Sequence, residues 1–126
     1  MSTEAADILR DVLLSLRSDG WARYSGGPRL SPPASGLPFE VGSPGGTCLK
    51  GAIDRVVMRE NRLRGLQLIE AEADCWPFVY RAIDGLFPER LGPADTMCDF
   101  NTHPATTFAN VEQVLEKAIA MAEELV

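Results

Sequence analysis

Three residues of types that can act together in catalysis are Cys48, Asn101 and His103. Cys48 precedes a run whose apolar spacing predicts a helix, and a thiol at a helix N-terminus is more nucleophilic than a free one. His103 is the only histidine, and Asn101 lies two residues before it. Cysteine, histidine and asparagine form the catalytic set of some thiol-dependent hydrolases. A small-ligand or thiol hydrolase site is therefore one hypothesis, with a buried structural Cys48 as the alternative.

The cysteines also raise the question of a metal or cofactor. Cys48, Cys75, Cys98 and His103 match the Cys₃His set that binds zinc, but only Cys98 and His103 lie close together in the sequence. Three cysteines without a Cys-x-x-Cys pair are typical of free thiols in a reducing cytoplasm. We therefore predict no metal and no cofactor.

A glycine-rich run, Gly42–Thr47, precedes the same expected helix, with Lys50 one turn further along. Free backbone N–H groups in such a run can bind an anion. The run lacks the lysine spacing of a nucleotide-binding loop and follows no clear strand, which favours a simple turn leading into the helix.

Length and composition limit the classes of protein to which this chain can belong. The 126 residues are 45% apolar, which predicts a single domain over 1–126 with one core. No apolar run approaches the roughly 18 residues of a membrane span, and the first residues are polar rather than basic and then apolar. We expect a cytoplasmic protein with no membrane partner.

Charge argues against nucleic acid as a partner, because the net charge is −6. The distribution is uneven. Residues 48–64 contain five basic and two acidic side chains, a net +3, whereas residues 65–126 contain three basic and eleven acidic ones, a net −8. The basic segment either pairs internally with the acidic remainder or presents a face to an acidic partner.

Apolar residues recur at offsets of three and four along most of the chain, which predicts an all-α fold. Gly20 is expected to end the first helix, with Trp21 folding back into the core, and Thr47 to cap the second. Pro77 is expected to begin a new helix that Gly85 ends, followed by a loop over 85–104. The helices are expected over 4–18, after Thr47, over 63–73, over 77–85 and over 108–125, with the first and last packed together.

Residues 25–46 include five prolines, six glycines and four serines, so we expect a long loop there. Leu37, Phe39 and Val41 alternate, which is compatible with a short β-ribbon laid against the helices. A loop of this length in a small domain is usually functional or mobile.

The stretch from Phe100 to Val111 predicts a turn followed by a helix. Asn101 can hydrogen-bond backbone two residues on, Pro104 keeps His103 extended, and Thr107 stands where a helix N-cap belongs. Asn110 occupies the position from which a glutamate would complete a capping box, and it is expected to reach back less well.

Three motifs together resemble an uncharacterised family of small actinobacterial and actinophage proteins, a domain of unknown function. They are Gly20-Trp21, Cys48-Leu49-Lys50-Gly51-Ala52 and Phe100-Asn101-x-x-Pro104-x-Thr106-Thr107-x-x-x-Val111. In that family aspartate often follows the asparagine and glutamate often stands three residues after the cap, where this chain has Thr102 and Asn110. The resemblance implies a phage or prophage origin and no catalytic residue.

Taken together, the sequence predicts a compact bundle of four to five helices with a Pro/Gly-rich loop over about 25–46. The leading hypothesis is a small non-enzymatic accessory protein, phage- or prophage-encoded, that binds a host or viral protein, with self-association as a further possibility. The expected contact residues are Phe39, Arg55, Arg59 and Arg62.

Overall fold

The computed structural model describes residues 2–23, 47–59, 66–90 and 96–124. These residues form five α-helices, a short 3₁₀-helix and no strand, so the prediction of an all-α fold is confirmed. The elements are α1 (Ser2–Asp19), α2 (Leu49–Arg59), α3 (Leu66–Leu86), η1 (Pro88–Arg90), α4 (Thr96–Thr102) and α5 (Phe108–Glu124).

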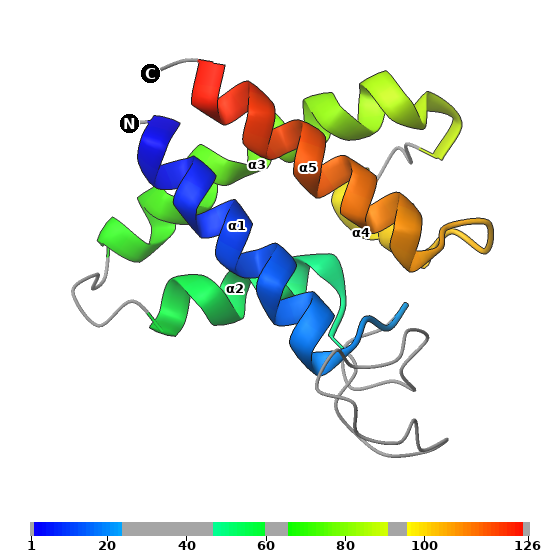
Figure 1. Cartoon of the computed structure of the whole chain (residues 1–126), viewed down its shortest axis with the longest axis horizontal. Helices are drawn as coiled ribbons and strands as arrows, with labels where there is room; N and C mark the ends of the chain where they lie inside the picture. The colour runs from blue at the N-terminus through cyan, green and yellow to red at the C-terminus, as the bar shows by residue number, and fades with distance from the viewer. Residues whose placement is uncertain (1, 24–46, 60–65, 91–95, 125–126) are drawn as a thin grey trace.

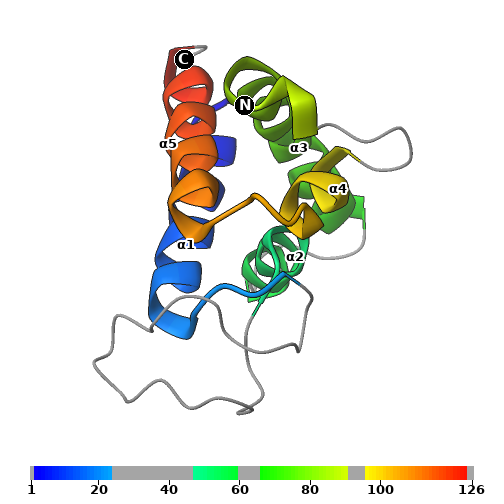
Figure 2. The same ribbon diagram turned by 90° about the vertical axis from the view of Figure 1, so that its right-hand side faces the viewer.

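The helices form two layers. The first and last helices, α1 and α5, lie side by side and run in opposite directions (Figure 1). This pairing confirms the expectation that the two ends of the sequence pack together. The second layer consists of α2, α3 and α4, which lie on one side of the α1–α5 pair (Figure 2).

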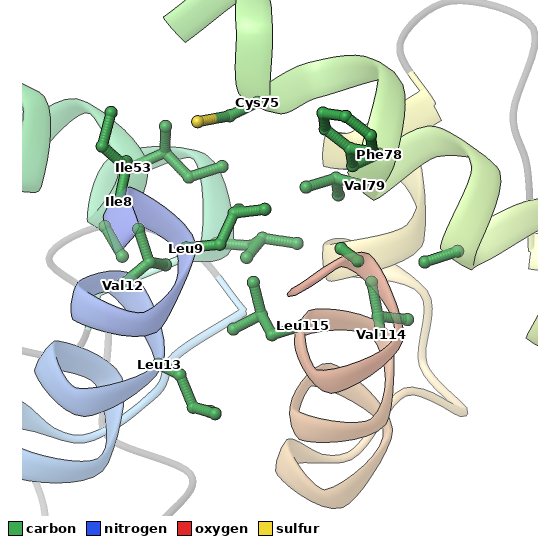
Figure 3. Close-up of a cluster of buried hydrophobic side chains, with 14 of the residues drawn as sticks. Ile8, Leu9, Val12, Leu13, Ile53, Cys75, Phe78, Val79, Val114 and Leu115 are labelled. Carbon is green, nitrogen blue, oxygen red and sulfur yellow. The ribbon is translucent and has the colours of Figure 1, made fainter. Parts of the chain in front are cut away.

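The core lies between these layers. Leu9 and Val12 of α1 and Leu115 of α5 point toward Ile53 of α2 and Val79 of α3 (Figure 3). All five side chains are completely or almost completely shielded from solvent. Full burial of a side chain of this size contributes about 1.5–3 kcal/mol, so the hydrophobic core to which these residues belong is a major source of stability.

The end of α1 is set by Gly20. Its N–H donates to the carbonyl oxygen of Leu16 at 2.9 Å, and its φ is 91°, a left-handed conformation that glycine adopts without a steric cost. Trp21 follows directly and is 1% exposed, which confirms its expected place in the core.

The prediction of a helix break at Pro77 is wrong, because α3 continues through Pro77. A proline inside a helix removes one backbone hydrogen bond and costs about 3 kcal/mol. Pro77 itself is exposed, whereas its neighbours Cys75, Phe78 and Val79 are buried in the core. Burial of these side chains offsets the local cost, and Gly85 lies within the helix that it was expected to end.

The prediction of a loop over 85–104 is also wrong, since this stretch contains η1 and α4. Met97 and Phe100 lie one helical turn apart and are both buried. Phe100 stacks on Phe87, with ring centroids 5.7 Å apart. Packing of these side chains therefore holds a helix of seven residues that would be unstable alone.

The expected loop and β-ribbon at 25–46, including Phe39, lie outside the described residues, as does Arg62. Within the described part of the chain, no helix has both the length and the apolar character needed to span a membrane.

Candidate functional site

The side chain of Asn101 is the centre of a buried hydrogen-bond network. It is 2% exposed and lies near the end of α4. Its Oδ1 accepts from Nε1 of Trp21 at 2.8 Å and from the backbone N–H of Leu49 at 3.0 Å. Its Nδ2 donates to the carbonyl oxygens of Ala22 at 3.3 Å and Arg23 at 2.8 Å. An asparagine amide has two donors and two acceptor positions, so all four are occupied.

Backbone pairing brings the partners of Asn101 together. Thr47 donates its N–H to the carbonyl oxygen of Gly20 at 3.2 Å, and its own carbonyl oxygen accepts from Ala22 N–H at 3.1 Å. These bonds form an isolated parallel bridge between Trp21 and Thr47. The residues that follow α1 and those that precede α2 are thereby held side by side, facing Asn101.

This pairing also changes the start of α2. Thr47 does not cap the helix as predicted, because the bridge holds its backbone extended and its buried Oγ1 has no hydrogen-bond partner. Cys48 takes the N-cap position instead. Its carbonyl oxygen accepts from Ala52 N–H at 2.9 Å, and its Sγ accepts from Gly51 N–H at 3.3 Å.

The turn between α4 and α5 is braced by Arg23. The guanidinium donates to the carbonyl oxygens of His103 at 3.3 Å, Pro104 at 2.9 Å and Thr106 at 3.0 Å. It also lies over the ring of Trp21, 5.9 Å from the ring centroid. Arg23 therefore links the end of the first helical segment to the turn that begins α5.

The start of α5 carries a reciprocal cap. Thr107 Oγ1 accepts from Asn110 N–H at 3.3 Å, and Asn110 Oδ1 accepts from Thr107 N–H at 3.1 Å. Asn110 therefore does reach back, despite being shorter than the glutamate of a typical capping box. Arg90 holds it in place by donating to the same Oδ1 at 2.7 Å while its guanidinium stacks on Phe87.

The residues of the hypothetical thiol site have structural roles. The amide of Asn101 lies beside the start of α2 but is fully engaged, and Cys48 Sγ accepts a hydrogen bond within α2. His103 is half-buried, and its Nδ1 accepts from Ala105 N–H at 3.1 Å. The described residues contain no group of three or more histidine, cysteine or acidic side chains placed to hold a metal ion, so the Cys₃His zinc hypothesis has no support.

Of the expected partner-contact residues, Arg55 lies on α2 and is exposed, and Arg59 is the last residue of that helix. Met58, which the sequence reasoning did not single out, is 74% exposed on the same helix. It is the most exposed large apolar side chain among the described residues. Basic and apolar groups thus lie together on the outer side of α2.

Carboxylates of α5 pair with arginines of α1. Arg17 contacts Glu112 at 2.7 Å and Glu116 at 3.3 Å, and Arg10 pairs with Glu123. These pairs are largely exposed, so each contributes less than about 1 kcal/mol. They show that α1 already supplies cations to three of the acidic side chains of α5.

Sequence reasoning placed Trp21 in the core but missed the hydrogen bond of its indole, and it missed the roles of Arg23 and Arg90. The sequence did contain one signal for the network around Asn101. The motifs around Gly20-Trp21, Cys48-Leu49 and Asn101 are the ones that carry the family resemblance. The structure joins all three at a single amide. Hydrogen bonding within the fold therefore accounts for the tryptophan and the asparagine of these motifs.

Comparison with protein-family models gives a match over nearly the whole chain. Residues 1–121 match a family model described as a family of unknown function (DUF6197). No curated protein and no solved structure matches the chain.

Proposed function

Because the chain belongs to a family of unknown function, DUF6197, whose model matches residues 1–121, we propose its role from geometry. We infer that it is a small non-enzymatic accessory protein that acts by binding another protein. The origin in a phage or prophage, and hence a host or viral partner in the host cytoplasm, is supported by the resemblance of its motifs to actinobacterial and actinophage proteins.

The observation that carries this proposal is the saturation of Asn101. The asparagine of a Cys-His-Asn set orients the histidine through a hydrogen bond, but all four hydrogen-bond positions of Asn101 are occupied by Trp21, Leu49, Ala22 and Arg23. The side chain is also 2% exposed. The amide of the Cys48, Asn101 and His103 set thus joins segments of the fold, which favours a binding role over chemistry.

The surface proposed for the contact is the outer side of α2. Arg55 and Met58 are three residues apart, so they lie on the same face of the helix, and both are exposed. Arg59 lies on the same helix, and Phe39 and Arg62 complete the proposed contact set. A partner with acidic and apolar side chains would complement this face.

The alternative is a small-ligand or thiol-dependent site centred on Cys48 and His103. One observation favours it, namely that Asn101 lies against Leu49, the residue after Cys48. Iodoacetamide labelling of the native protein tests whether the thiol is reactive. Modification confined to Cys48, with loss of function in Cys48→Ser, would support this alternative over the binding proposal.

The binding proposal is tested with tagged protein in a lysate of an actinobacterial host at low salt, with mass spectrometry of the retained proteins. A retained protein is then purified and titrated against the wild type and against a variant carrying Arg55→Glu and Met58→Glu. We expect the variant to bind at least tenfold more weakly. The matched control is Leu14→Glu, which changes a side chain of α1 that is 60% exposed.

Two results would overturn parts of this proposal. If no protein is retained from lysate under gentle conditions, the binding role itself is contradicted. If a purified partner binds the α2 variant and the wild type equally well, the binding role stands but the contact surface lies elsewhere.

A further inference from the structure

We draw no further inference here: the strongest candidate, the side-chain cluster of Arg23, Arg90 and Thr107 at the N-terminus of α5, carries none because both guanidinium groups already donate to protein oxygens and no second feature of the described residues points to a ligand.

Discussion

The indole Nε1 of Trp21 donates to Oδ1 of Asn101 across 2.8 Å, in the buried part of the molecule. The two residues are 80 positions apart in the sequence. The bond joins the turn after α1 to the end of α4, and the same Oδ1 also accepts from the first residue of α2. One amide therefore fixes how three elements meet.

Substituting Asn101 with alanine should reduce the free energy of unfolding by about 3–5 kcal/mol. The change removes the acceptor of two buried donors, the Trp21 indole N–H and the Leu49 N–H, and also the donor to two carbonyl oxygens. A buried donor that loses its acceptor costs about 1–3 kcal/mol, so the two N–H groups account for a loss in this range. Urea denaturation followed by circular dichroism measures the effect.

The matched control for Asn101 is Thr102→Ala. Thr102 is half-buried, and its hydroxyl donates within α4 to the carbonyl oxygen of Cys98. We expect a loss below about 1 kcal/mol from this change. Equal losses for the two variants would show that the Asn101 network has no special structural role.

Cys48→Ser should leave the protein folded and as stable as the wild type, or up to about 0.5 kcal/mol more stable, because serine is a strong N-cap residue. Cys48→Ala should lose about 0.5–1 kcal/mol through removal of the acceptor for Gly51 N–H. Thermal melts of both variants measure these changes. A serine variant that is fully folded but has lost its function would argue for thiol chemistry.

Thr107→Ala should cost about 1 kcal/mol by removing the N-cap of α5. Asn110→Glu should have the opposite sign and add about 0.5–1 kcal/mol, since a carboxylate there would face both the positive end of the helix dipole and Arg90. Chemical denaturation of the single variants and of Asn110→Glu with Arg90→Ala separates the two contributions. A gain that survives removal of Arg90 would be due to the helix dipole and to the capping bond with Thr107 N–H.

Gly85→Ala should stabilise the protein by about 0.5–1 kcal/mol, because alanine is the better helix former in the last turn of α3. An added Cβ would come within 2.6 Å of Nζ of Lys117, the flexible end of an exposed side chain that can move aside. The same change in a Lys117→Ala background measures the cost of that displacement. Destabilisation in both backgrounds would contradict the expectation.

Replacement of residues 24–46 by a flexible linker of about twelve residues should leave the helical body folded. The bridge between Trp21 and Thr47 is parallel, so the linker has to turn back on itself, which takes about a dozen residues. Loop-closure entropy then predicts a gain of about 0.5 kcal/mol in the free energy of unfolding. Circular dichroism and thermal melts test this prediction, and loss of the helical signal would show that the segment contributes to the core.

The excised protein also tests the assignment of Phe39 to the contact set. If the body folds normally and binds a purified partner more weakly than the wild type, the segment contributes to the interface. Unchanged affinity would restrict the contact to α2.

The local signals in the sequence were sufficient for the helices at the two ends of the chain. The spacing of Leu9, Val12 and Leu16 predicts one apolar face for α1, and all three residues are buried. Gly20 ends α1 through its own positive φ, and the apolar stripe of α5 is buried as expected. These features depend on residues only a few positions apart, so the sequence contains the physical information that decides them.

The tertiary structure decided the features that depend on residues far apart in the sequence. Pro77 would break an isolated helix, yet α3 continues because the flanking apolar side chains are buried against other elements. The short α4 forms for the same reason. The sequence singled out Asn101 and Cys48 by residue type, but whether an amide faces solvent, a substrate or four protein groups depends on which segments fold around it. Those partners come from residues 21–23 and 49, whose approach to Asn101 is set by packing of the whole bundle.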